Sequence, residues 1–472
     1  MRTKFAKLAL MVCLGLSVLI AVSCFESSNL GNQGLTSGTE FTPTVLGLNP
    51  GKNNSEMNFN WLSGNEVGTN KSVVRLLKGY YHIKDFKGTY GAAGDNRQHK
   101  VTVMDLEPDV EYTYRVSNDS TNWSVPYTFK TAPKGSFKFA AVADIQPSCS
   151  EACPTDEGSE IYMWGKTLTE IANAGATLIV NAGDHAMNGR EIEYEGYFYP
   201  SQLRSIPTAP VMGNHDTYAS GTYAKNFKYH FNLPNIIYGT APYTEQANYY
   251  FLYNRVLFIG LNTSDESSSD TNAYNNASKF ITDFKKTFVA AKKAHSPTQY
   301  DFIVVSHHRT TNSIQGGSHA LEATTLAYQD AGLQRIMTEN GVDLVITGHD
   351  HIYVRSKLMY NDTVSTNGTG TYYLTIKPGS GTDGRGSGIG FDKTTADSYK
   401  DRYPWLLIEI NEKYFPISYE KHLAYTKDNF GYAIFEVSGT GHNAKMAVKM
   451  YEYPYTNTNP SDTFTITPTL SK

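Results

Sequence analysis

The sequence predicts two folded domains, an all-β sandwich of immunoglobulin or fibronectin III type followed by an α/β domain. Short segments of alternating polarity fill residues 41–132, the pattern of strands with one buried face. From residue 135 onward, continuous apolar runs indicate strands that are buried on both faces. Helix-like stretches separate several of these runs, and an alternation of strand and helix is typical of α/β domains.

The N-terminus has the pattern of a secretory signal. Arg2, Lys4 and Lys7 precede an uncharged stretch at residues 8–22, which is short for a membrane span and is charged on one side only. Small and apolar residues precede Cys24, as in a bacterial lipobox. We therefore expect a lipoprotein-type signal at residues 1–23 and a lipid on Cys24, with an ordinary secretory signal as the alternative.

Residues 24–40 and the overall charge limit the partners. This segment is rich in Ser, Gly and Asn, the composition of a flexible tether. A formal net charge of −4 without a run of basic residues excludes an electrostatic surface for nucleic acid or anionic lipid. We expect membrane contact only through the lipid anchor, at the periplasmic face or the cell surface, or a freely secreted protein.

Four cysteines occur, and two of them lie in the signal or at the anchor. The remaining pair, Cys149 and Cys153, is close in sequence. An exported protein meets an oxidising environment, so a short-loop disulfide is expected. A metal role is the alternative, although no further cysteine remains to complete a thiolate site.

The all-β domain consists of short segments separated by turn residues such as Asn-Pro-Gly and Glu-Pro-Asp. It contains no cluster of histidines or carboxylates, which favours a role as a spacer or packing module. Its expected strands include residues 57–61, 71–77, 100–106, 111–117 and 126–131.

The α/β domain is expected at residues 135–456, after a short linker. Helices are predicted near 159–175 and 321–341, the second ending at a glycine. Two alternating segments near the end, 431–438 and 445–453, add strands to the same domain. Residues 457–472 are expected to form a C-terminal tail.

Five of the apolar runs end on polar side chains that can bind metal. Ligands collect at the carboxyl ends of strands in α/β sheets, so these groups should converge. One such residue alone would be weak support, because a lone Asp after a strand is usually a helix cap. The side chains are Asp144 and Gln146; Asp184; Asn214, His215 and Asp216; His307 and His308; His349 and His351.

The ligand types indicate which metal ions the site can bind. Imidazoles, carboxylates and amide oxygens without thiolates suit Fe, Mn or Zn in a mixed nitrogen and oxygen site. Alternate side chains return to one side of an extended backbone, so His349 and His351 can reach adjacent ions. The sequence therefore predicts a site for two metal ions.

The order Asp-x-Gln, Gly-Asp, Gly-Asn-His-Asp, Ser-His-His and Gly-His-x-His resembles the calcineurin-like metallophosphoesterase superfamily, and its details resemble purple acid phosphatases. The segments LEPDVEYTYRVS and SVPYTFKTAP are similar to the N-terminal module of that family. The resemblance covers nearly the whole mature chain. It implies a metallophosphoesterase β-sandwich flanked by helices, preceded by a fibronectin III-like domain.

The resemblance also implies the ligand sets. The first ion would be held by Asp144, Gln146, Asp184 and His351. The second would be held by Asp184, Asn214, His307 and His349, with Asp184 as the bridge. A hydroxide shared by the two ions would attack phosphorus.

His215 would donate a proton to the leaving group, oriented by Asp216. A second interpretation of His215, as a residue that only orients a ligand, stays open. On the substrate side, His308 and Arg309 lie beside a ligand and can face a phosphate, with Arg309 as a forked donor. The resemblance implies that His319 binds substrate, with a surface loop residue as the alternative.

Two positions depart from the family pattern. Purple enzymes carry a tyrosinate ligand where this chain has Met187, which puts the colour and a strictly ferric first site in doubt. Many relatives have histidine in place of Gln146, and an amide oxygen is a weaker donor for late transition metals.

We therefore expect an exported, metal-dependent phosphohydrolase that acts on a small phosphorylated substrate, most simply a phosphomonoesterase. Two alternatives remain. One is a phosphodiesterase or nucleotidase that uses the same centre, and the other is a non-catalytic surface binding lipoprotein. The expected partners include no nucleic-acid polymer.

Overall fold

The computed structural model describes residues 40–65, 68–217, 225–238, 248–264, 270–310, 327–328, 330–351, 353–360, 363–381, 430–455 and 459–469. The expected signal, the expected lipidation site Cys24 and most of the expected tether lie outside these ranges. Within them, no helix is long and apolar enough to cross a membrane.

The N-terminal domain is a sandwich of two antiparallel four-stranded sheets, as predicted. One sheet has the order β1-β2-β6-β5, with β1 Leu46–Pro50, β2 Met57–Gly64, β6 Asn96–Val103 and β5 Thr89–Ala93. The other has the order β4-β3-β7-β8, with β4 Tyr81–Lys87, β3 Val73–Lys78, β7 Glu111–Ser117 and β8 Tyr127–Lys130.

Alternation along β2 explains the packing of this domain. Met57, Phe59 and Trp61 face the partner sheet and belong to the core of the sandwich. The intervening Asn58 and Asn60 point to the opposite face, yet they are 3% and 1% exposed. Their burial indicates that a further layer covers this outer face.

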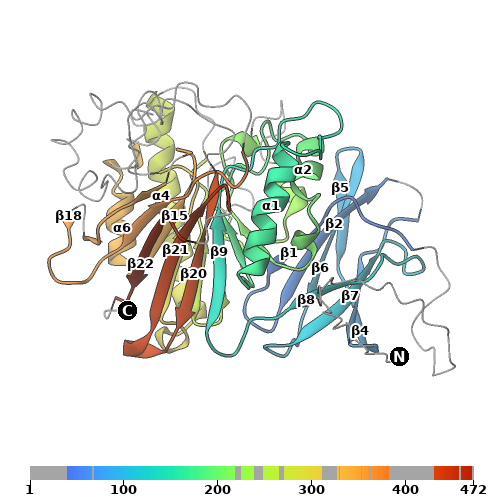
Figure 1. Ribbon diagram of the computed structural model, residues 1–472, viewed down its shortest axis with the longest axis horizontal. Helices are drawn as coiled ribbons and strands as arrows, with labels where there is room; N and C mark the ends of the chain where they lie inside the picture. Colours follow the sequence, from blue (N-terminus) through green and yellow to red (C-terminus); the bar gives the residue numbers. More distant parts are fainter. Residues whose placement is uncertain are drawn as a thin grey trace, which may run out of the picture. The chain divides into compact units, whose positions relative to one another are not determined.

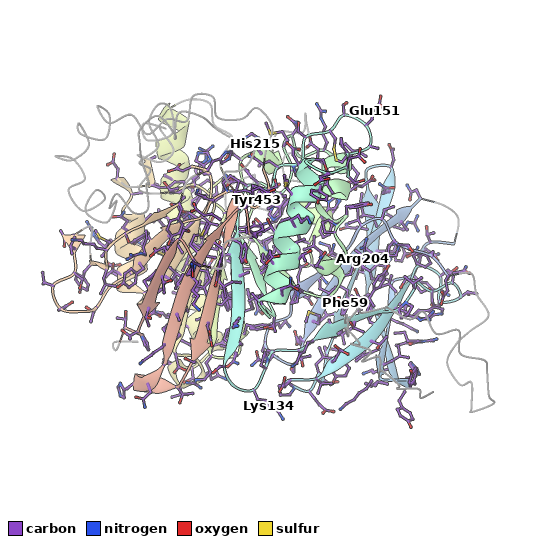
Figure 2. The ribbon with its side chains drawn as sticks, in the orientation of Figure 1. Phe59, Lys134, Glu151, Arg204, His215 and Tyr453 are labelled. Carbon is purple, nitrogen blue, oxygen red and sulfur yellow. A yellow bond between two sulfur atoms is a disulfide. The ribbon has the colours of Figure 1, made fainter. Side chains whose placement is uncertain are left out.

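The α/β domain begins after Lys134, which Figure 2 labels in the connection between β8 and β9. Its first sheet has the order β11-β10-β9-β20-β21-β22, in which β9, β10 and β11 are parallel. The strands are β9 Phe137–Val142, β10 Ile179–Asn181, β11 Thr208–Pro210, β20 Gly431–Ser438, β21 Lys445–Glu452 and β22 Asp462–Ile466.

The second sheet has the order β12-β13-β14-β15-β19-β16, and β13, β14, β15 and β19 are parallel. Its strands are β12 Tyr249–Tyr253, β13 Val256–Gly260, β14 Phe302–Ser306, β15 Leu344–Thr347, β19 Tyr372–Thr375 and β16 Val354–Arg355. A small hairpin follows, formed by β17 Met359–Tyr360 and β18 Thr363–Val364.

The two sheets pack face to face. Phe139 of β9 meets Phe258 of β13 edge to face at 5.3 Å and stacks on Phe435 of β20 at 4.4 Å. Helices flank the sheets, with α1 against the first sheet and α4 against the second, as Figure 1 shows. The expected β-sandwich flanked by helices is therefore confirmed.

The first predicted helix is found close to its expected residues, whereas the second begins at Leu333, well inside its predicted range of 321–341, part of which lies outside the described residues. Ser159 caps α1 Glu160–Asn173, accepting a hydrogen bond from the amide of Tyr162, and α6 Leu333–Glu339 ends just before Gly341, whose φ is +68°. The other α-helices are α2 Glu191–Tyr197, α3 Lys225–His230 and α4 Asp270–Ala294. The 3₁₀ helices are η1 Ser201–Arg204, η2 His215–Thr217, η3 Pro297–Gln299 and η5 Gly441–Asn443.

One expectation is wrong. Residues 457–472 were expected to form a tail, but β22 pairs with β21 along the edge of the first sheet, with Ile466 opposite Met446. Ile466 is 1% exposed and packs in the core. Burial of this edge strand ties the end of the described chain to the α/β domain.

Candidate metal centre

The expected strand ends meet at one edge of the two sheets. Asp144 follows β9, Asp184 follows β10 and His308 follows β14, and one ligand atom of each lies within 4.8 Å of the others. All three side chains are buried. His215, which follows β11, lies at the upper end of the sheets in Figure 2.

The backbone adopts the left-handed conformation at five predicted ligand positions. The φ angles are +52° at Asp144, +45° at Gln146, +57° at Asp184, +71° at His349 and +55° at His351. Each such residue costs about 1–3 kcal/mol and persists only where the surrounding structure holds it. Strain concentrated at these side chains indicates a site that the fold holds in place for function.

Glycines allow these loops to approach one another. A Cβ on Gly213 would lie 2.0 Å from Asp184 Oδ1, and a Cβ on Gly348 would lie 2.7 Å from Asp144 Oδ2. A Cβ on Gly183 would lie 2.5 Å from the His308 ring. These distances are shorter than any tolerated contact, so glycine is required at all three positions.

Asp184 is the hub of the cluster. Its Oδ2 lies 2.6 Å from Gln146 Nε2 and 3.2 Å from His308 Nε2, and its Oδ1 accepts from the amide of His215 at 2.9 Å. Burial by itself would raise the pKa of Asp184, but the surrounding imidazoles, chiefly His308, hold it well below its usual range. The hub is therefore an anion surrounded by nitrogen groups.

Asp144 joins the first and last motifs. Its two carboxylate oxygens accept from the amide of His349 at 3.1 and 3.0 Å, and its Oδ1 lies 3.6 Å from His351 Nε2. Gln146 contributes its amide group beside Asp184. An amide can present either its nitrogen or its oxygen by rotating 180°, so Gln146 can turn its oxygen toward a cation at this position.

The histidine pair after β14 is arranged differently from the expectation. His308, expected on the substrate side, lies 2.9 Å from Asn214 Oδ1 through its Nε2, while its Nδ1 lies 2.8 Å from the Ala182 carbonyl. This carbonyl fixes the ring with Nε2 directed into the cluster. Although burial opposes it, Asp184 and Asp144 raise the pKa of His308 to about 9.

His307, expected as a ligand, lies outside this cluster of ligand atoms. Its Nδ1 lies 2.9 Å from the Arg309 carbonyl, and its Nε2 has no hydrogen-bond partner among the described residues. Burial lowers the pKa of His307 to about 4. It is therefore a buried neutral imidazole with one ring nitrogen still able to accept a proton or a metal.

Of the other two residues expected on the substrate side, the structure describes Arg309 but not His319. Arg309 is 9% exposed, and its Nη1 lies 3.3 Å from His349 Nε2, so a guanidinium borders the cluster. His349 in turn packs edge to face on His308, with ring centroids 5.1 Å apart. His319 lies outside the described residues.

His215 has the position of a proton donor. Its Nδ1 lies 2.7 Å from the Met187 carbonyl, and its Nε2 lies 4.0 Å from Asp184 Oδ2. The side chain is 21% exposed, whereas that of Asp184 is 1% exposed. Met187, which occupies the position of the missing tyrosinate, thus orients His215 through its backbone.

Asp216 binds the loops together. Its Oδ1 accepts from the amides of His185 and Ala186 and from the Tyr194 hydroxyl, at 3.0, 3.3 and 2.8 Å. Its Oδ2 accepts from the Gly213 amide at 2.9 Å and lies 3.1 Å from His185 Nδ1. Asp216 therefore fixes the loops that carry Asp184 and His215, a role different from the expected contact with the His215 ring.

His185 and Tyr194 are supporting residues that the sequence analysis did not identify. His185 is 0% exposed. It follows Asp184 directly, and this position next to a predicted ligand was the one sequence signal that could have identified it. Tyr194 lies in α2, and its spacing from the motifs gives no such signal.

The residues of this cluster fit metal ions. Two carboxylates with side chains no more than 1% exposed lie beside imidazoles and an amide at the ends of converging strands. The carboxylates of Asp144 and Asp184 have oxygens within 4.8 Å of each other. Two buried carboxylates this close repel each other unless a cation or a proton lies between them. The mixture of oxygen and nitrogen donors is suited to Fe, Mn or Zn.

Comparisons with known proteins agree with this geometry. Residues 137–353 match the family described as calcineurin-like phosphoesterase, and residues 43–131 match the purple acid phosphatase N-terminal domain. No curated protein matches the sequence.

The solved structures that share the fold include a purple acid phosphatase and PhoD. The purple acid phosphatase PPD1 from yellow lupin (Lupinus luteus) seeds is 17% identical, with a TM-score of 0.61 over 89% of this chain and 74% of that chain. PhoD is 12% identical, with a TM-score of 0.59 over 92% of this chain and 92% of that chain. This chain therefore contains a purple acid phosphatase N-terminal domain followed by a calcineurin-like phosphoesterase domain, the domain of metal-dependent phosphoric ester hydrolases.

Proposed function

We propose that the protein is an exported phosphomonoesterase with two metal ions in its active site. The observation that carries this proposal is the buried cluster of Asp144, Asp184 and His308, with the partly exposed His215 beside it. A cluster of buried ligands gives a place for cations, and an exposed imidazole next to it gives a proton donor that substrate can reach.

The structure supports one change in the expected ligand sets. For the first ion we retain Asp144, Gln146, Asp184 and His351. For the second we propose His308 in place of His307, together with Asp184, Asn214 and His349, because the His308 Nε2 is directed at Asn214 and Asp184. When bound, such ions lower the pKa of water and neutralise phosphoryl oxygens.

The side chains of this protein supply the rest of the chemistry. The hydrogen bond from His215 Nδ1 to the Met187 carbonyl leaves Nε2 to hold the proton that the leaving alkoxide needs. Asp216 holds together the loop that carries Asp184 and the loop that carries His215. Arg309 offers a forked donor for phosphoryl oxygens beside His349.

Preference for a monoester follows from charge. A phosphomonoester dianion carries one more negative charge than a diester, and Arg309 adds a cation at the border of the site. A phosphodiesterase or nucleotidase is the second candidate, because the same metal cluster serves both reactions.

The test compares hydrolysis of 4-nitrophenyl phosphate with that of bis(4-nitrophenyl) phosphate. We expect the aryl monoester to react faster than the diester. His215→Ala should abolish most of the rate on an alkyl monoester such as glycerol 2-phosphate, whose leaving alkoxide needs a proton. A much faster diester reaction would favour the second candidate, and two bound ions without any hydrolysis would favour a binding lipoprotein.

Export and lipidation rest on the N-terminal sequence. We propose that Cys24 carries the lipid and that residues 24–40 tether the domains to a membrane surface. Mass analysis of the mature N-terminus tests this: a lipid on Cys24 is expected, which Cys24→Ser removes. A protein released in soluble form after cleavage would contradict the anchor.

A further inference from the structure

We infer that the N-terminal sandwich positions the metal-binding loops, acting through the short helix α3. This inference rests on the proposed dimetal function, and it gives the sandwich a role other than that of a spacer. The supporting contacts form a continuous path from β2 and β6 to Asp184 and His215.

The path begins at two neighbouring residues on the outer face of the sandwich. Asn60 of β2 and Lys100 of β6 are direct cross-strand partners. Asn60 Nδ2 donates to the carbonyl of His230, and Lys100 Nζ donates to the carbonyl of Lys228 at 2.7 Å. The last carbonyls of a helix have no partner within the helix, so the sandwich caps the C-terminal end of α3.

The next residues strengthen the attachment. Asn232, two residues after α3, accepts from Asn58 Nδ2 at 2.8 Å, and its own amide donates to Asn49 Oδ1 at 2.7 Å. Its side-chain amide donates to the carbonyls of Phe59 and Val101 at 3.2 and 3.3 Å. Because backbone and side chain are both held, the end of α3 is fixed to three strands of one sheet.

The last residue of α3 carries the connection into the α/β domain. The His230 ring stacks on Tyr194 with centroids 4.3 Å apart and an interplanar angle of 14°. His230 Nε2 also lies 3.0 Å from Glu191 Oε1, at the start of the same helix α2. His230 is 0% exposed, so its ring has little freedom to move without displacing Tyr194.

Tyr194 completes the path. Its hydroxyl donates to Asp216 Oδ1 at 2.8 Å, and Asp216 holds the amides of the loops after β10 and β11. Asp184, between Gly183 and His185 in the first of these loops, accepts from the amide of His215 in the second. A shift of α3 would therefore be transmitted to the proposed bridging ligand and to the proposed proton donor.

The expected loss of metal affinity and activity can be estimated from the effect of removing residues that orient metal ligands in other proteins. Removing a group that orients a ligand typically lowers metal affinity or activity by about 10- to 100-fold. Asn60 and Lys100 act through intermediate residues, so we expect about a tenfold effect for each. KM should change less than kcat, because these residues do not contact substrate.

The experiment measures Mn²⁺ affinity by calorimetry and kcat on 4-nitrophenyl phosphate in the full-length protein. The variants are Asn60→Ala, Lys100→Met and Tyr194→Phe, the last of which keeps the ring stack and removes the hydroxyl. Asn118→Ala is the matched control, because Asn118 accepts from the Trp61 indole at 2.6 Å within the sandwich and thus tests destabilisation of that domain alone.

We expect weaker Mn²⁺ binding and lower kcat in all three variants, and wild-type values in Asn118→Ala at a comparable loss of thermal stability. The double variant of Asn60→Ala and Tyr194→Phe should lose less than the product of the single effects, because both act through Asp216. If the variants bind Mn²⁺ like the parent, the inference is wrong while the proposed function stands. If the parent itself binds no metal, the proposed function fails instead.

Discussion

Replacing His308 by alanine tests which histidine of the pair belongs to the metal centre. His308 Nε2 lies 3.2 Å from Asp184 Oδ2, and both side chains are no more than 1% exposed. Removing one partner of a buried ion pair leaves the other charge without compensation, which costs about 3–5 kcal/mol. His307→Ala removes a neutral imidazole and one contact with the Arg309 carbonyl, whose loss costs about 1 kcal/mol.

Urea unfolding with chelator and with saturating Mn²⁺ measures both effects. At 100 times Kd, a ligand stabilises the native protein by about 2.7 kcal/mol. We expect His307→Ala to keep most of this stabilisation and His308→Ala to lose most of it. The reverse order, in which His308→Ala retains stabilisation by Mn²⁺ and His307→Ala does not, would refute the assignment.

The pH dependence of the metal-free protein gives a second readout of the same ion pair. Although burial opposes it, the carboxylates of Asp184 and Asp144 raise the pKa of His308 in the folded protein from its ordinary value of 6.5 to about 9. The protonated form of His308 therefore contributes its full stability below pH 6.5, and this contribution is lost as the pH rises through about 9. We expect this loss in the parent and in His307→Ala, and a flatter profile in His308→Ala.

Three further substitutions test the surroundings of the site and the sandwich. Gly213→Ala should destabilise the protein by about 1–3 kcal/mol in thermal unfolding and weaken Mn²⁺ binding, because the new Cβ would lie 2.0 Å from Asp184 Oδ1; normal binding would contradict this. Asp216→Asn keeps the shape but replaces an acceptor oxygen by a donor, so Mn²⁺ affinity measured by calorimetry should fall by about 10- to 100-fold. Burial is the main reason why the pKa of His99 is lowered to about 4. The stability that neutral His99 contributes is therefore complete above pH 6.5 and is lost as the pH falls toward 4. His99→Gln should remove up to about 3 kcal/mol of this acid-induced loss in urea unfolding, and an unchanged profile would show that His99 does not titrate with unfolding.

The convergence of the site was predictable because each motif follows an apolar run. The run 137–143 ends just before Asp144, and its strand β9 lies at the centre of the first sheet. The left-handed backbone of Asp144 and Gln146 was not predictable, because it accompanies hydrogen bonds from their amides to the carbonyls of Gly183 and Asp184 in the loop after β10. The glycines of the motifs were visible, but their contacts with ligand side chains required the fold.

The order of the histidine pair could not be read from the sequence. Adjacent residues on extended backbone point to opposite sides, and the ladder continues past β14, since the amide of His307 donates to the Ile346 carbonyl at 3.1 Å. This register turns His308 toward Asp184. A motif alone does not say at which residue the ladder ends.

The attachment of the sandwich was hidden for a similar reason. Alternation in β2 correctly places Asn58 and Asn60 on the outer face, but a period of two does not distinguish water from a neighbouring domain. A solvent-exposed strand face usually carries residues such as lysine or threonine, and asparagine is uncommon in strands. The two asparagines were therefore the available signal that this face is covered. The edge strand β22 was missed because its pairing with β21 depends on a long-range contact.

The most direct test of a dimetal phosphohydrolase is a metal titration of the chelator-treated protein, followed by hydrolysis of 4-nitrophenyl phosphate. Mn²⁺, Fe²⁺ and Zn²⁺ are added in turn, and bound metal is counted by elemental analysis. We predict no activity without metal, and full activity when two ions are bound per chain for at least one of these metals. Full turnover in the presence of chelator, or with fewer than two bound ions, would contradict the proposed centre.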